Sequence, residues 1–339
     1  MAYIILNKNN FFNNLDIIAK STKGRDKIAL VLKDNAYGHG LLEMASLAKE
    51  GGVKKAVVRT AKEAEAVCDF FEYILVLAEI PLSKNDKIRY TINDINSIER
   101  FPQGCRVELK VDTGMHRNGI DINELEEAFV KIKDAKLVLE AVFTHHRSAD
   151  ELTSEWFWQK ENFKTVKEES QRLSQKYGFG TLRFHSSNSA SLFRHESFDE
   201  DMARVGIAAY GCLELPEALH MEKLKPVLSL WADKISQREL KVGERVGYGG
   251  EYTAASDCII GNYEFGYGDG FLRCCAKEGY KTPEGIELLG RISMDNSTFA
   301  GCEEKLLVFS DARVVAKYAK TISYEVLTSL KPEIKRVVI

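Results

Sequence analysis

Little in this sequence would hold the chain in a membrane or on nucleic acid. No apolar run approaches the roughly 18 uninterrupted residues that a membrane-spanning helix needs. The 47 Lys and Arg residues are balanced by 50 Asp and Glu residues, which leaves a net charge of -3 and no long block of one sign. An electrostatic basis for binding nucleic acid or an anionic membrane surface is therefore missing.

The cysteines are widely scattered along the chain. The seven cysteines are an odd number without a C-x-x-C pair, a pattern typical of reduced structural thiols rather than of a disulfide framework. The adjacent Cys274 and Cys275 leave a metal-binding or redox role open. The first twenty residues break into an Asn-rich, acidic stretch after a few apolar residues, which is unlike a signal peptide. We therefore expect a cytoplasmic protein.

The composition that is present belongs to a soluble globular protein. Hydrophobic residues make up 45%, charged residues 29% and aromatic residues 10% of the 339 residues, so the chain can bury a large core. At roughly 150 residues per domain, this length suggests two domains.

Short apolar runs alternate with amphipathic segments between residue 28 and about residue 210. This rhythm is typical of parallel βαβ units, and eight such units predict a (β/α)8 barrel of the α/β class, with a doubly wound sheet as the alternative. The candidate strands cover residues 29–32, 56–58, 73–78, 89–92, 106–111, 137–143, 182–185 and 205–210.

The sequence pattern changes after about residue 225, where Gly-rich turns separate short apolar runs or runs of alternating apolar and polar residues. The runs at 226–232, 258–267, 286–294 and 305–310 predict a mostly antiparallel β domain. We place the barrel at residues 10–224 and the β domain at residues 225–339. Residues 1–9, which contain the apolar run YIIL, are expected to pair with the β domain.

Chemistry in a barrel gathers where the βα loops meet, at the carboxyl ends of the strands. The side chains there are rich in Lys, Arg, His and hydroxyls and poor in carboxylates, which suits an anionic cofactor such as a phosphate better than a divalent metal. Lys33 directly follows the first strand, and partial desolvation there favours the neutral amine needed to react with a carbonyl group. The candidates are Lys33, Tyr37, Lys110, Asp112, Arg117, His145, His146, Asn188, Ser189, Arg204 and Gly206.

A family resemblance becomes specific at Lys33. The segment VLKDNAYGHG at 31–40 resembles the pyridoxal-phosphate attachment motif of the alanine racemases. Eight further segments resemble successive motifs of that family, in family order, through residue 326: VELKVDTGMHRNGI, VFTHHRSAD, HSSNSAS, ARVGIAAYG, VGYGGEYTA, FGYGDGFLR, GRISMDN and TISYEV. The resemblance implies a barrel that carries pyridoxal 5'-phosphate, a C-terminal β domain, and interconversion of L-alanine and D-alanine that supplies D-alanine for peptidoglycan.

The resemblance also implies which residues act as bases. Lys33 would hold the cofactor and serve as the base for the D enantiomer, and Tyr248 matches the base for the L enantiomer. A free tyrosine has a pKa of about 10, which is too high for an efficient base at neutral pH. In the family, hydrogen bonds from the tyrosine to a histidine and on to an arginine support this role, and these two residues match His145 and Arg204 here. In the family, the lysine and the tyrosine meet only across a dimer interface, so a homodimer is implied.

The remaining site residues are also carried over from the family. Arg204 would hydrogen-bond the pyridine nitrogen, and the phosphate contacts match Tyr37, Ser189, the backbone amides of Gly206 and Ile207, and Tyr324. Arg117 matches the arginine beside the cofactor's phenolic oxygen and the substrate carboxylate. Lys110 matches a lysine that is carbamylated in many members, although an unmodified Lys110 paired with Asp112 fits equally well. The substrate residues matched from the β domain are Met294, Asp295 and Tyr267.

Other functions remain open at this point. A racemase of broader specificity or one acting on serine is the nearest alternative, and Asp34 and Arg147 add charges that the family usually lacks near the site. A non-catalytic pyridoxal-phosphate carrier or a decarboxylase of this fold ranks lower. His145 and His146 suggest a metal hydrolase, but neighbouring strand residues point to opposite sides. Motifs for nucleotide binding and for serine hydrolases are absent from the sequence.

Overall fold

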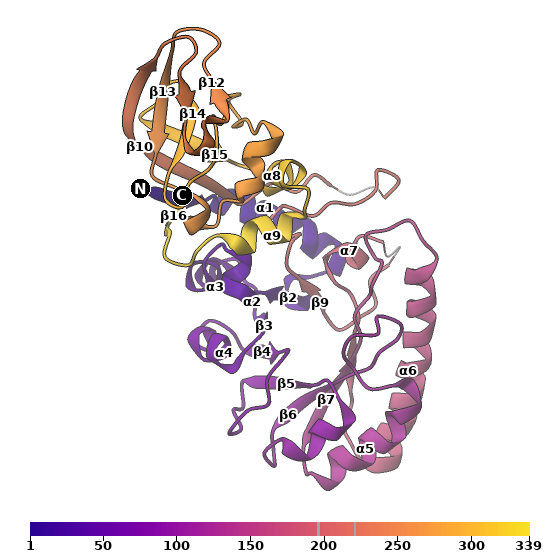
Figure 1. Cartoon of the computed structure of the whole chain (residues 1–339). Helices are drawn as coiled ribbons and strands as arrows, with labels where there is room; N and C mark the ends of the chain where they lie inside the picture. Colours follow the sequence, from indigo (N-terminus) through magenta and orange to yellow (C-terminus); the bar gives the residue numbers. More distant parts are fainter. Residues whose placement is uncertain (195–196, 220–221) are drawn as a thin grey trace.

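The computed structural model describes residues 1–194, 197–219 and 222–339. Figure 1 shows a barrel in the lower part of the molecule and a β domain above it, with the two chain termini close together in the upper domain. The predicted barrel and β domain are therefore confirmed. Within the described ranges, no helix combines the length and the apolar character that crossing a bilayer requires.

Eight parallel strands form the barrel, in the spatial order β8-β7-β6-β5-β4-β3-β2-β9. Their residues are mostly buried and apolar because both faces of each strand are covered. The bounds are β2 (Ile28–Val31), β3 (Lys55–Val58), β4 (Tyr73–Val76), β5 (Ile88–Ile92), β6 (Arg106–Lys110), β7 (Val138–Phe143), β8 (Arg183–His185) and β9 (Ala203–Val205).

The eighth predicted strand, at residues 205–210, is wrong over most of its length. The strand β9 ends at Val205, and the chain then turns because the Gly206 carbonyl accepts hydrogen bonds from the amides of Ala209 at 2.8 Å and Tyr210 at 3.3 Å. The run looks like a strand because this turn is itself buried, with Ile207 and Tyr210 at 1% and 0% exposure.

The barrel closes through a loose seam between β8 and β9. No ladder joins these two strands in the described part of the chain, and single hydrogen bonds cross instead, from the Arg204 amide to the Ser187 carbonyl at 2.9 Å and from the Asp201 amide to the Phe184 carbonyl at 3.1 Å. The seam therefore brings the end of β9 beside the end of β8 while leaving room for side chains between them.

Helices surround the strands, with α5 and α6 on the outer side of the lower half in Figure 1. The longest, α6, buries Trp156, Phe163, Val166 and Leu173, which recur at helical spacing. The helices of this part are α1 (Lys8–Thr22), α3 (Leu41–Glu50), α4 (Ala61–Val67), α5 (Leu125–Asp134) and α6 (Glu155–Tyr177), with the short α2 (Lys33–Tyr37) and α7 (Ser189–Leu192) at the strand ends.

The β domain is built around the long strand β10 (Leu228–Leu240). β10 pairs antiparallel with β1 (Ala2–Leu6), β13 (Cys258–Tyr263) and β15 (Lys305–Phe309). Further strands are β14 (Ser297–Ala300), β16 (Lys335–Val338), which runs parallel to β1, and the hairpin of β11 (Arg245–Val246) and β12 (Tyr252–Thr253). Because β1 lies inside this sheet, we propose that residues 1–9 belong with the β domain and that the division falls near residue 225.

Two features of the β domain differ from the sequence prediction. The run at 286–294 forms no strand, and only the isolated bridges Lys281 to Glu287 and Leu288 to Phe299 involve it. The segment after β15 forms two helices, α8 (Ala312–Ala319) and α9 (Ser323–Ser329). Helix α9 packs against α2 and brings the β domain to the mouth of the barrel.

Candidate active site

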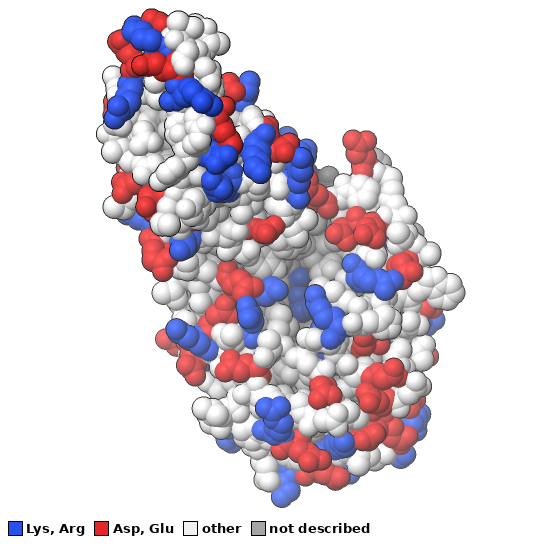
Figure 2. Space-filling model, in the orientation of Figure 1, with Lys and Arg blue, Asp and Glu red and all other residues white. Residues whose placement is uncertain are grey.

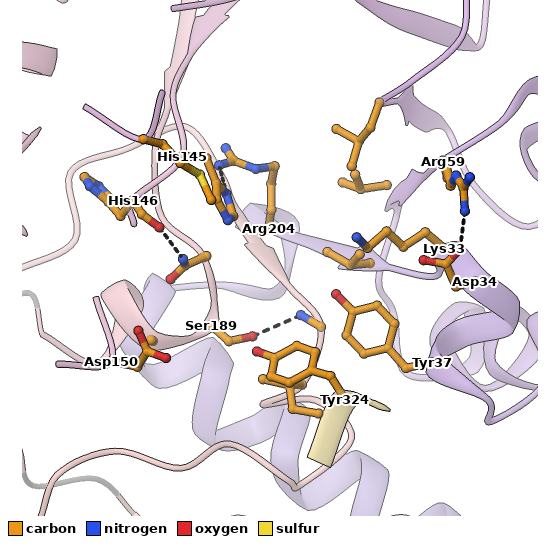
Figure 3. A pocket seen from close by; sticks show the side chains of 18 of the residues that line it. Lys33, Asp34, Tyr37, Arg59, His145, His146, Asp150, Ser189, Arg204 and Tyr324 are labelled. Carbon is orange, nitrogen blue, oxygen red and sulfur yellow. Dashed lines mark hydrogen bonds and ion pairs between the residues drawn. The ribbon is translucent and has the colours of Figure 1, made fainter. Parts of the chain in front are cut away.

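A pocket of about 770 Å³ opens where the carboxyl ends of the barrel strands meet. Figure 2 shows Lys and Arg side chains inside this hollow, and Figure 3 shows side chains from separate loops pointing toward it. Twelve of the predicted site residues line the pocket: Lys33, Tyr37, Lys110, Arg117, His145, His146, Asn188, Ser189, Arg204, Gly206, Ile207 and Tyr324.

Lys33 stands where β2 ends, and a left-handed turn follows it. Asp34, Asn35, Ala36 and Tyr37 have φ values of 53°, 56°, 51° and 51°, a conformation that costs about 1–2 kcal/mol per residue. Hydrogen bonds hold the turn in place, because the Glu63 carboxylate accepts from the Asp34 amide at 2.8 Å. The turn aims Tyr37 into the pocket, and Lys33 Nζ lies 6.0 Å from the centre of the Tyr37 ring.

Hydroxyl groups gather at one end of the pocket. The rings of Tyr37 and Tyr324 lie 5.6 Å apart, and burial raises the pKa of both phenols, so both stay protonated and can donate. The Ser189 hydroxyl accepts from the Gly206 amide at 3.1 Å, which leaves its own hydrogen for another acceptor. A Cβ at Gly206 would lie 2.9 Å from the Tyr37 hydroxyl, so only glycine fits here. The backbone amide of Ile207 has no acceptor among the described residues.

Arg204 is fixed by acceptors around its two Nη atoms. Nη2 donates to the carbonyls of Thr144 at 2.6 Å and Ser186 at 3.1 Å, and Nη1 donates to the carbonyl of His185 at 3.3 Å and to its ring Nδ1. The Nε hydrogen has no acceptor within the described ranges, so it remains for a ligand. Burial lowers the pKa of Arg204 to about 10, and the guanidinium stays charged at neutral pH.

The two adjacent histidines have different surroundings. His145 Nδ1 lies 3.4 Å from Arg204 Nη2, and His146 Nε2 lies 2.9 Å from the Ser186 hydroxyl. Burial, followed by the charges of Arg204 and Lys110, holds the pKa of His145 well below its usual range, so this imidazole is neutral. The described residues contain no cluster of three His, Cys, Asp or Glu side chains that could hold a metal ion.

Lys110 ends β6 and lines the same pocket as Arg117. Burial first, and then the charges of Arg117 and Arg204, lower the pKa of Lys110 to about 8. The side chain of Asp112 has other partners: Oδ1 accepts from the amides of Gly114 and Met115, each at 2.9 Å, and Oδ2 lies 3.6 Å from His116 Nδ1. In the described part of the chain, no carboxylate lies within ion-pair distance of Lys110.

Four predicted residues lie elsewhere on the same chain. Tyr248 sits between β11 and β12 and is 69% exposed, while Met294 and Tyr267 are 55% and 42% exposed on the β domain beside Asp295. None of them lines the pocket of its own chain.

The pocket also contains Arg59, which the sequence did not single out, beside the two unusual charges Asp34 and Arg147. Arg59 follows β3 directly and donates to Asp34 at 3.1 Å (Figure 3), so the charge of Asp34 is compensated. Arg147, the other charge that the family usually lacks near the site, forms an ion pair with Glu155. Reading the residue after every strand, β3 included, would have found Arg59.

Comparisons with known proteins match alanine racemases over nearly the whole chain. The model of the alanine racemase N-terminal domain matches residues 6–214, and that of the alanine racemase C-terminal domain matches residues 227–338. Alanine racemases of a Nitratiruptor species and of Campylobacter curvus are 46% and 44% identical, each over 99% of both chains. The solved alanine racemase of Clostridium difficile 630 has a TM-score of 0.89 at 26% identity, covering 100% of this chain and 95% of its own. The chain therefore belongs to the alanine racemase family.

Proposed function

We propose that this protein interconverts L-alanine and D-alanine with pyridoxal 5'-phosphate and so supplies D-alanine for peptidoglycan. The observation that carries the proposal is the pocket itself. It places an amine, a charged arginine with one unused N–H, and a set of hydroxyl donors around one space, on a chain whose full-length relatives are named alanine racemase. A base for the opposite side of the substrate would come from a second copy of the chain.

The pocket fits this cofactor at three points. The Lys33 amine can bond the aldehyde carbon, and the free Nε hydrogen of Arg204 can donate to a pyridine nitrogen. Tyr37, Tyr324, Ser189 and the Ile207 amide offer hydrogens to a phosphate, which loops at this place in a barrel commonly bind. The Gly206 amide, now bonded to Ser189 at 3.1 Å, would contribute by exchanging that acceptor for a phosphate oxygen.

The protein residues then handle the proton on the Cα atom of alanine. When bound, pyridoxal phosphate withdraws electrons from that carbon and acidifies its proton. Lys33 Nζ would take or return the proton on one side, for the D enantiomer. The partner subunit's Tyr248 would do so on the other side, for the L enantiomer. Arg117, exposed at the pocket mouth, would hold the substrate carboxylate, since an arginine pairs with a carboxylate through two parallel hydrogen bonds.

His145 would support the tyrosine. An arginine has only donors, so His145 Nδ1, 3.4 Å from Arg204 Nη2, can only be an acceptor that shares a hydrogen with the neighbouring carbonyls. The single proton of the neutral ring therefore lies on Nε2. That Nε2–H would donate to the phenolate oxygen of the partner subunit's Tyr248 and stabilise it as a base. The dimer follows from the same requirement, because within one chain Tyr248 does not reach the pocket. Met294, Asp295 and Tyr267 would approach the substrate from the same partner surface.

Lys110 is expected to carry a carbamate. A pKa of about 8 leaves far more neutral amine at physiological pH than an ordinary lysine has, and only the neutral amine combines with carbon dioxide. The product is an anion that would anchor Arg117. With ¹³C-labelled bicarbonate, a carbamate carbon signal should appear in the ¹³C spectrum of the wild type and be absent from Lys110→Arg; a spectrum without that signal in either protein would leave Lys110 unmodified.

The activity is tested on purified protein with added pyridoxal phosphate. We expect racemisation of alanine, followed by chiral chromatography from each enantiomer, at rates well above those on serine, lysine and arginine. Higher rates on serine or on several amino acids would replace alanine by a broader substrate range. A protein that binds the cofactor but exchanges no Cα proton with solvent deuterium would contradict the proposal and favour a carrier.

A further inference from the structure

Below the pocket, the barrel interior holds a carboxylate to which the proposed mechanism gives no role. Glu108 lies in the middle of β6, and its side chain is 0% exposed. It accepts hydrogen bonds from the Tyr73 hydroxyl at 2.6 Å and from Arg183 Nη2 at 2.9 Å, and its other oxygen lies 2.9 Å from His185 Nε2. Burying a carboxylate costs desolvation free energy. The three hydrogen-bond partners offset that cost and hold the side chain of Glu108 in one position.

His185 connects this carboxylate to the pocket. Its side chain is also 0% exposed, and its ring stacks on Phe143 with centroids 4.7 Å apart, so the ring cannot rotate freely. One ring nitrogen faces Glu108 and the other faces Arg204 Nη1. The seam between β8 and β9 makes this contact possible, because Arg204 on β9 lies directly beside His185 on β8.

The proton positions in the hydrogen-bonded series Glu108–His185–Arg204 follow from which groups can donate. Arg204 can only donate, so His185 Nδ1 must accept, and the one proton of a neutral ring must lie on Nε2, where the carboxylate of Glu108 accepts it. Burial opposes ionisation of Glu108, but the hydrogen bond from His185 and the charge of Arg183 hold the pKa of Glu108 below the usual range, so Glu108 is the anion this arrangement needs. Burial also lowers the pKa of His185, which keeps its ring neutral.

We propose that Glu108 is a positioning residue for Arg204: it accepts a hydrogen bond from Nε2–H of His185, thereby fixes the tautomer whose Nδ1 accepts from Arg204, and so holds the guanidinium with its Nε–H aimed into the pocket. This inference goes beyond the proposed function, and its catalytic part rests on that function because Arg204 is assigned to the pyridine nitrogen. The tautomer itself is a property of the protein without cofactor.

A glutamine at residue 108 removes this control while keeping the shape of the side chain. An amide can turn its NH₂ group toward His185, and the ring then accepts at Nε2 and carries its proton on Nδ1. That proton would face the N–H groups of Arg204, and two donors would meet where one hydrogen bond now exists. Aspartate at residue 108 keeps the charge on a side chain shorter by one methylene and serves as the conservative variant.

Glu140 provides a matched control. It lies on the neighbouring β7 in the same interior, accepts from Arg89 at 2.9 Å and Arg183 at 2.8 Å, and also pairs with Arg106. Glu140→Gln therefore removes a comparable ion-paired carboxylate that even shares Arg183 with Glu108. It does not touch His185, so a purely structural loss would appear equally in both variants.

The experiment combines ¹⁵N NMR of histidine-labelled protein without cofactor and steady-state racemisation with cofactor. We expect His185, assigned by its absence in His185→Gln, to carry its proton on Nε2 in the wild type, in Glu140→Gln and in Glu108→Asp. Glu108→Gln should shift the proton to Nδ1 and lower kcat by about 10-fold, the size typical for an outer partner of a functional group. Glu140→Gln should stay within about 2-fold of wild-type kcat, because its charge does not act through His185.

Several results would overturn the inference. A doubly protonated or Nδ1-protonated His185 in the wild type would do so, as would an unchanged tautomer in Glu108→Gln or equal kcat losses in Glu108→Gln and Glu140→Gln. If Glu108→Gln does not fold, Glu108→Asp carries the comparison, since a shift of the proton to Nδ1 with the charge retained contradicts the argument. Failure of the wild type to racemise alanine would count against the proposed function only, because the tautomer is measured without cofactor.

Discussion

Replacing Lys33 with alanine should lower alanine racemisation by on the order of 10⁴-fold or more in both directions. The reason is that one amine has two tasks, attachment of the cofactor and proton transfer on the side of the D enantiomer. Lys33 is half-buried at the end of β2 and is held there by the left-handed turn that Glu63 supports. The pocket holds one other lysine among its described residues, Lys110, which ends a different strand.

The Lys33 prediction is checked by rate and by chemistry. Chiral chromatography should show the loss from both enantiomers, and borohydride treatment should fix the mass of the cofactor on the peptide that contains residue 33 in the wild type but on no peptide in Lys33→Ala. Lys62→Ala, which changes an exposed lysine on α4, is the control and should behave as the wild type. Racemisation by Lys33→Ala within 10-fold of wild type, or fixation at another lysine, would remove Lys33 from its role.

Tyr248→Phe should produce an asymmetric defect. The change removes only a hydroxyl, and loss of a general base lowers racemisation by about 10²–10⁴-fold. Lys33 is untouched, so the Cα proton of D-alanine should still exchange with solvent deuterium, while that of L-alanine should not. Proton NMR in deuterium oxide, run separately from each enantiomer, measures both exchange rates directly.

The control for Tyr248→Phe makes the same chemical change in the same hairpin. Tyr252 begins β12, four residues beyond Tyr248, and lines no part of the pocket. Tyr252→Phe should therefore keep both exchange rates. Equal loss of exchange from the two enantiomers in Tyr248→Phe would mean that the hydroxyl acts on the whole site rather than on one side of the substrate.

The sequence predicts the barrel well because parallel strands in a βαβ fold are buried on both faces and form short apolar runs between helical segments. The errors have the same origin. Residues 206–210 are apolar because a buried turn needs apolar side chains as much as a strand does, and 286–294 is apolar without forming a ladder. A local run of apolar residues indicates that a segment is buried. It does not indicate whether the backbone of that segment forms the hydrogen-bond ladder of a strand.

Site residues were predictable where position along a strand determines function. Lys33, Lys110 and Arg204 all stand at or beside the carboxyl end of a strand, and the same rule would have reached Arg59. Glu108 and Glu63 were beyond this rule, because their roles depend on contacts with other strands and loops. Tyr248 was identified by the family resemblance alone, since its chain places it outside its own pocket.

The most direct test of the account mixes the two inactive variants. If each site combines Lys33 of one chain with Tyr248 of the other, a heterodimer of Lys33→Ala and Tyr248→Phe contains one site with both residues intact. Random exchange of subunits makes half of the dimers heterodimers, so activity should return to about one quarter of the wild-type value per chain. A mixture that exchanges subunits, verified by mass, and yet stays as inactive as its parents would contradict a site shared between two copies of this chain.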